Sequence, residues 1–62
     1  MEKQDLLKET LRLMNATQRP VNEVCRKVGV TPRWYYMLLS GEIHDPGVRK
    51  IQRLHEVLTE AA

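Results

Sequence analysis

Apolar side chains recur at helical spacing in four stretches of the chain, and its glycines and prolines fall between or at the ends of these stretches. The first stretch, residues 2–15, lacks Gly and Pro and is rich in residues that favour helices. Its apolar stripe spans about 160° of a helical wheel, which exceeds the roughly 100° that one buried face requires. We expect Leu6 and Leu13 to face the core. The other edge of the stripe, expected to stay partly exposed, consists of Leu7, Leu11 and Met14.

The second predicted helix covers residues 20–28. Its apolar residues follow the i, i+3, i+4, i+7 rule of a buried helix face: Val21, Val24, Cys25 and Val28. Pro20 suits the first turn, and Gly29 is expected to end the helix in the left-handed conformation. Cys25 is interpreted as a core residue, because a single cysteine cannot form an internal disulfide and no metal-ligand spacing surrounds it. The lone cysteine favours a reducing, cytoplasmic location.

Two more helices are predicted, over residues 32–40 and 46–60. Thr31 can cap the third helix, and Pro32 fits its first position. Asp45 is expected to cap the fourth helix, whose core face consists of Ile51, Leu54 and Leu58. No repeat or strand pattern occurs, and no apolar run approaches the ~20 residues of a membrane span. The acidic start is unlike a signal peptide. The sequence therefore predicts an all-α domain over residues 1–62, a compact bundle of four short helices.

The second and third predicted helices have the spacing of a helix-turn-helix, over about residues 20–41. Only three residues, Gly29-Val30-Thr31, join them. Cys25 is small enough for a close helix crossing, and Gly29 can adopt the positive φ that the corner needs. The apolar residues expected to hold the third helix against the second are Val30, Tyr35 and Leu38.

On these residues the chain resembles the phage repressor and Cro-like family of helix-turn-helix transcriptional regulators, which have the lambda-repressor-like fold. The resemblance covers roughly Pro20–Leu58 and includes the stretch "SGEIHDPGVRKIQRLHEVL" after the motif. It implies that the third helix is a recognition helix that enters the major groove of DNA. The sequence departs from the family pattern at two positions. Val21 and Pro32 stand where relatives often carry a glutamine that contacts a phosphate or a base.

Base-reading residues are expected on the side of the third helix opposite Tyr35 and Leu38. These residues are Arg33, Tyr36, Met37 and Ser40. An arginine matches the O6 and N7 acceptors of guanine, and apolar groups can contact thymine methyls. Trp34 falls at the boundary between the two sides and is interpreted as a half-buried brace.

Phosphate contacts are expected mainly at helix starts, where backbone N–H groups are free to bind anions. The candidates are Arg19, Asn22, Thr31, His44, Gly47, Val48 and Arg49. Arg26 and Lys27 are interpreted as solvated surface. No metal site is expected, because His44 and His55 are far apart in the chain and no further ligands cluster near them.

The charge distribution agrees with an anionic partner. The net charge is only +2, but residues 19–53 hold seven Lys or Arg against three Asp or Glu. A central concentration of positive charge suits an anionic partner, although solvated helix faces would also explain it.

The function predicted from these features is sequence-specific binding of double-stranded DNA by a transcriptional regulator. It would be a phage or prophage repressor in the bacterial cytoplasm that acts as a homodimer on a two-fold operator. The dimer contact is expected from helix four, through Val57 and Ala61-Ala62, or from the open edge of helix one. The alternative is a helix-turn-helix module for protein contacts, such as an adaptor or antitoxin. An enzyme is not expected, because no nucleophile with a paired base, carboxylate pair or Gly-rich phosphate loop is found. No cofactor, small-molecule substrate or membrane partner is expected.

Overall fold

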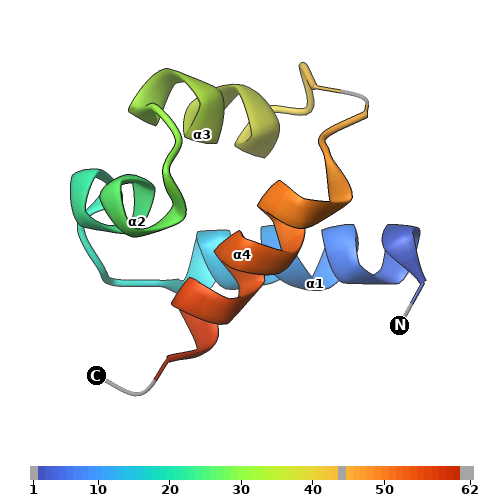
Figure 1. Cartoon of the computed structure of the whole chain (residues 1–62), viewed down its shortest axis with the longest axis horizontal. Helices are drawn as coiled ribbons and strands as arrows, with labels where there is room; N and C mark the ends of the chain where they lie inside the picture. The colour runs from blue at the N-terminus through green and yellow to red at the C-terminus, as the bar shows by residue number, and fades with distance from the viewer. Residues whose placement is uncertain (1, 44, 61–62) are drawn as a thin grey trace.

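Four α-helices and no strands are found in the residues that the computed structural model describes, 2–43 and 45–60. The helices are α1 Lys3–Ala16, α2 Val21–Val28, α3 Pro32–Leu39 and α4 Val48–Thr59 (Figure 1). The predicted number and order of the helices are confirmed. In the first three helices, no bound differs from the prediction by more than one residue.

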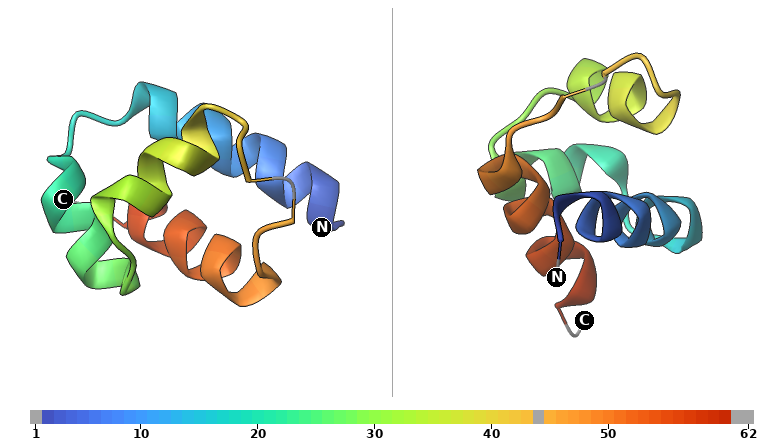
Figure 2. Two further views of the ribbon diagram at one scale, coloured as in Figure 1. Left: turned by 90° about the horizontal axis from the view of Figure 1, so that it is seen from above. Right: turned by 90° about the vertical axis from the view of Figure 1, so that its right-hand side faces the viewer.

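The helices pack around one core, with α1 crossing behind α4 and α2 lying beside both α4 and α3 (Figure 1). Every helix contributes to this core. Its buried residues are Met14, Val24, Cys25, Tyr35, Leu38, Ile51, Leu54 and Val57. The described domain measures 26 × 23 × 19 Å along its principal axes. Figure 2 shows α3 on the outside of the bundle, so that one of its sides stays open to solvent.

Local sequence features set the turn between α2 and α3 as predicted. Gly29 has a φ of 91°, and its N–H donates to the Cys25 carbonyl at 2.8 Å. Thr31 caps α3, because its hydroxyl oxygen accepts from the Trp34 N–H at 3.1 Å. Pro32 occupies the first helical position. Gly41, with a φ of 86°, follows the end of α3.

The helix α4 was predicted to begin at Pro46 with Asp45 as its N-cap residue, and both predictions are wrong by two residues. The helix begins at Val48, and its N-cap residue is Gly47, which has no side chain that could cap it. Asp45 is therefore not the N-cap residue of α4. Pro46 is buried and Gly47 has extended backbone (φ −61°, ψ 139°), so the chain stays extended through residue 47. The first helical bond runs from the Ile51 N–H to the Gly47 carbonyl.

The predicted core edges of α1 and α4 need correction. Leu6 packs against the core as predicted, but Leu13 is half-buried and lies outside the core cluster. Met14 is buried, and Leu7 and Leu11 also pack against the core. In α4, Ile51 and Leu54 are buried as predicted and Leu58 packs against the core, but Val57 is also fully buried. The helical wheel gives the width of an apolar stripe, but the crossing of α1 over α4 decides which edge is covered. Met14 and Val57 are therefore unable to form an exposed dimer patch, and Ala61-Ala62 lies outside the described residues.

The burial of Cys25 in the core can be tested by the reactivity of its thiol. The side chain is 1% exposed, and burial raises the pKa of the thiol. Burial also raises the pKa of the Tyr35 hydroxyl. Folding therefore favours the neutral thiol and the neutral phenol. The free energy of unfolding that depends on these two groups is at its maximum below about pH 8.5 and falls as the pH rises further. We expect a thiol reagent to label Cys25 only on unfolding, and the unfolding midpoint to fall in alkaline buffer. Labelling of the native protein at the rate of a free cysteine would contradict this placement.

Candidate nucleic-acid interface

The two sides of α3 differ sharply in exposure. Tyr35 and Leu38 are each 2% exposed and anchor the helix in the core. The residues predicted to read bases lie away from that anchor. Arg33, Tyr36 and Ser40 are exposed, with Tyr36 at 55%, and Met37 is half-buried. The Ser40 hydroxyl donates to the Met37 carbonyl at 3.1 Å, so its oxygen remains able to accept a further hydrogen bond.

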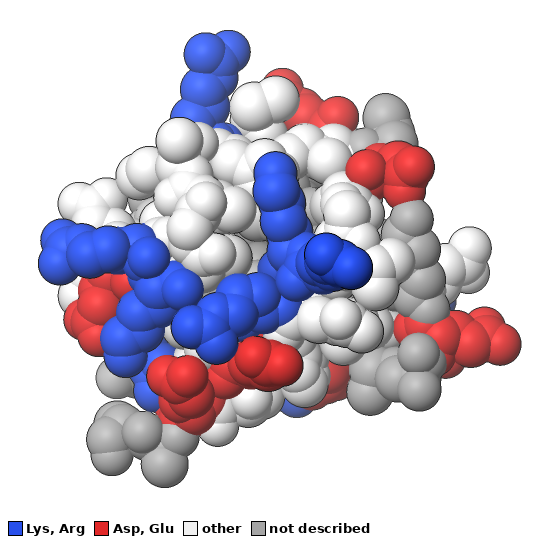
Figure 3. Space-filling model, in the orientation of Figure 1, with Lys and Arg blue, Asp and Glu red and all other residues white. Residues whose placement is uncertain are grey.

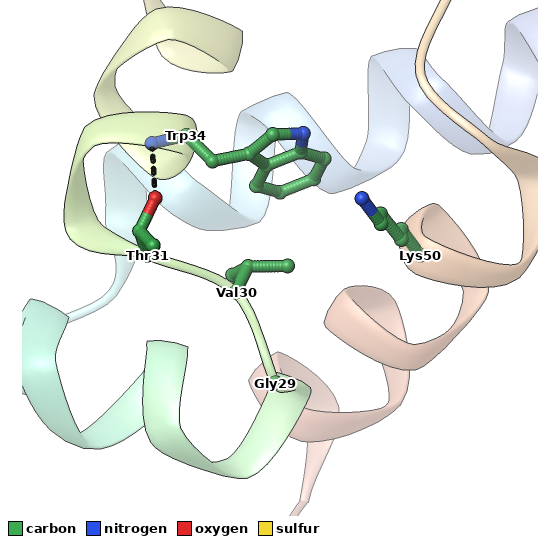
Figure 4. Close-up of a pocket in the computed structure, with 5 residues that line it drawn as sticks. All are labelled: Gly29, Val30, Thr31, Trp34 and Lys50. Atoms are coloured by element: carbon green, nitrogen blue, oxygen red, sulfur yellow. Dashed lines mark hydrogen bonds between the residues drawn. The ribbon is translucent and has the colours of Figure 1, made fainter.

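Trp34 connects α3 to the first turn of α4. The indole is half-buried and packs against the core, as predicted. The Lys50 ammonium lies 5.7 Å from the centre of the indole ring, within the range of a cation–π contact (Figure 4). Between them is an open hollow of about 200 Å³, lined by Gly29, Val30, Thr31, Trp34 and Lys50. This contact joins the first turn of α4 to α3, and no sequence pattern indicates it.

The start of α4 is suited to an anion. It has no acidic residue in its first turn, and its N-cap residue, Gly47, has no side chain. The backbone N–H groups of Val48 and Arg49 precede the first helical bond, so they have no partner within the helix. Gly47, also predicted as a phosphate contact, is the N-cap residue. His44 lies outside the described residues.

Two other predicted phosphate contacts are at the starts of α2 and α3. Asn22 is exposed in the first turn of α2. Thr31 is exposed, and its hydroxyl proton remains available while its oxygen caps α3. The candidate residues thus come from the starts of α2, α3 and α4, and their contact with phosphates stays a prediction.

Arg19 has a structural partner that the sequence did not indicate. Its guanidinium donates to the Val57 carbonyl at 2.6 Å and to the Glu60 carbonyl. These two residues lie at the C-terminal end of α4, where the Glu60 N–H also donates to the Val57 carbonyl, at 3.4 Å. The residues joined are 38 and 41 positions apart in the chain, beyond the reach of a local pattern. A phosphate contact of Arg19 stays a prediction, but the guanidinium already binds the end of α4.

Replacing Arg19 by alanine is therefore expected to destabilise the domain by about 1 kcal/mol, the net value of a typical hydrogen bond, because the side chain is half exposed. Urea unfolding followed by circular dichroism measures this change. The control is Arg12→Ala, which removes an exposed ion pair with Glu9 within α1 and should shift the midpoint less. Equal shifts in the two variants would show that the contact with α4 contributes nothing.

Lys and Arg side chains gather on the face formed by α2 and α4 (Figure 3). Lys27 lies 3.7 Å from a Glu60 carboxylate oxygen, and Arg53 lies 3.4 Å from one of Glu56. Exposed pairs of this kind contribute little to stability. The prediction treated Lys27 as solvated surface and did not single out Arg53 or Lys50. The folded chain places these residues from separate helices on one face.

Comparison of the chain with models of known protein families, with curated proteins and with solved structures finds no match. Within residues 2–43 and 45–60, no three His, Cys, Asp or Glu side chains are grouped as metal ligands would be. In the same part of the chain, no helix has the length and apolar character needed to cross a membrane. The function is therefore argued from the geometry and charges of α3 and of the helices beside it.

Proposed function

We propose that this protein is a sequence-specific double-stranded DNA-binding regulator of transcription, of the phage or prophage repressor type. In this proposal α2, the turn 29–31 and α3 act as a helix-turn-helix, and α3 enters the major groove. The observation that carries the proposal is the division of α3 into an anchored side, with Tyr35 and Leu38, and an open side bearing Arg33.

The dimensions and chemistry of α3 support a groove contact. An α-helix with its side chains is about 10–12 Å in diameter, which fits the major groove, about 12 Å wide. Arg33 provides donors for a guanine, and the exposed ring of Tyr36 can contact a thymine methyl. Position on the duplex would come from phosphate contacts at Asn22, Thr31 and the start of α4, because such contacts orient a protein without reading sequence.

A homodimer on a two-fold operator is part of the proposal. One recognition helix reads only a few base pairs, which is too few for a unique site. Two copies would place their recognition helices one DNA turn apart, with half-sites about 10 base pairs from centre to centre. Leu13, half-buried and outside the core cluster, is the α1 residue that a contact through α1 would cover. Sedimentation of the protein with its site tests this stoichiometry; a one-to-one complex at full affinity on a non-palindromic site would contradict it.

Selection of bound sites from random duplex DNA tests the function itself. The proposal predicts enrichment of one short motif with two-fold symmetry. Failure to enrich any sequence under low-salt conditions would contradict it and favour the protein-contact alternative. The exposed ring of Tyr36 would then be the first residue to examine as a docking contact.

A further inference from the structure

A band of four basic residues runs over α2 and α4, and one of them contacts Trp34 of α3. This basic band consists of Arg26, Lys27, Lys50 and Arg53. The first two lie in the last turn of α2 and the other two in α4. All four side chains are exposed. Figure 3 shows basic side chains spread over α2 and α4 on this face.

Two contacts make the basic band continuous with α3. Arg53 donates from Nη2 to the Lys27 carbonyl at 3.4 Å, which joins α4 to the end of α2. Lys50 stands against the Trp34 ring, which joins α4 to α3. The basic band therefore begins at the helix that carries the proposed base-reading residues and extends away from it.

Carboxylates border the basic band on its far edge. Glu56 pairs with Arg53 and Glu60 with Lys27, and both acids belong to the C-terminal part of α4. Figure 1 shows that this end of α4 points away from α3, and Figure 3 shows acidic side chains below the basic ones. These carboxylates offset part of the positive charge of Lys27 and Arg53.

We propose that the basic band binds phosphates of the duplex that flanks the site read by α3, an inference that rests on the proposed function. Duplex DNA carries one negative charge per ~1.7 Å of its axis, so a row of flexible cations next to a bound groove meets phosphates outside the base-specific contacts. An acidic protein segment could also pair with such cations. DNA is favoured because Lys50, at one end of the basic band, contacts α3 itself.

The test compares duplexes of two lengths. One is the selected site trimmed to the shortest duplex that retains full specificity, and the other carries ten extra random base pairs on each side. Affinity is measured by fluorescence anisotropy over a salt series for the parent protein and for Arg26→Gln/Lys27→Gln. The control is Lys8→Gln/Arg12→Gln, which removes the same charge from exposed positions of α1. Thermal unfolding by circular dichroism verifies that each variant is folded.

For the parent protein, we expect the salt slope to be steeper on the long duplex by up to about 3.6 units, near 0.9 for each of four neutralised phosphates. The Arg26→Gln/Lys27→Gln variant should lose about half of this difference while binding the short duplex like the parent, and the α1 control should keep all of it. Specific binding with the same length dependence in parent and variant would overturn this inference and leave the proposed function standing. Absence of any preferred duplex would overturn both. Binding of poly-L-glutamate that the variant loses, without any length dependence on DNA, would assign the basic band to an acidic protein and overturn the proposal.

Discussion

Tyr35→Ala is expected to lower the free energy of unfolding by about 3–5 kcal/mol, the usual cost of truncating a buried aromatic side chain. Tyr35 is 2% exposed and belongs to the core cluster that holds α3 in place. At about 0.05–0.15 kcal/mol per residue, a domain of 62 residues has roughly 3–9 kcal/mol in total. The variant should therefore be largely unfolded or close to it at 37 °C, as urea and thermal unfolding would show.

Tyr36→Ala is the matched control, since it removes the same side chain from the next position. The Tyr36 ring is 55% exposed, and its contact with Tyr35 is edge-to-face, with centroids 5.8 Å apart and planes at 82°. Loss of such a pair costs at most about 1.5 kcal/mol. If the two alanine variants were destabilised equally, the assignment of one side of α3 to the core and the other to solvent would be contradicted.

Arg33→Ala is expected to weaken binding to the selected DNA site by about 1–3 kcal/mol, equivalent to roughly 5- to 150-fold. The loss should fall on specific binding, with the preference relaxed at one base pair, because an arginine in the major groove contacts base edges. Arg33 is exposed and outside the core, so the stability of the domain should be nearly unchanged. Competition between the selected site and its single-base variants measures both effects. Unchanged affinity for specific and random duplexes would remove Arg33 from the groove.

Arg49→Ala separates base reading from phosphate binding. Arg49 lies in the first turn of α4, whose N-cap residue is Gly47. Loss of its side chain should weaken binding to all duplexes alike and reduce the slope of log affinity against log salt concentration by about one unit. An unchanged slope would remove Arg49 from the phosphate contacts.

The features predicted correctly from the sequence are those that depend on neighbouring residues. Gly29 ends α2 and Thr31 caps α3, because each acts within a few positions of its own backbone. The start of α4 was misplaced because burial of Pro46 and the extended backbone of Gly47 overrode the capping signal at Asp45. The buried edge of α1 was misplaced for a similar reason, since only the crossing with α4 decides between Leu13 and Met14.

In the candidate interface too, the features that depend on neighbouring residues are predicted and the contacts between separate helices are not. Helical spacing placed Arg33 and Tyr36 opposite Tyr35, and their exposure agrees with that expectation. The contacts of Arg19 with the end of α4 and of Lys50 with Trp34 join residues distant in the chain. No periodicity could have indicated them, because they arise when separate helices meet.

The most direct test of the central claim, that the open side of α3 reads DNA, is an NMR titration of ¹⁵N-labelled protein with the duplex obtained by selection. The proposal predicts the largest amide shift changes at Arg33, Tyr36 and Ser40 in and next to α3 and at Val48 and Arg49 in α4. The amides of the first two turns of α1 should change little. A scrambled duplex at the same concentration should leave the α3 amides nearly unshifted. Changes confined to α1, or equal changes with both duplexes, would contradict sequence reading by α3.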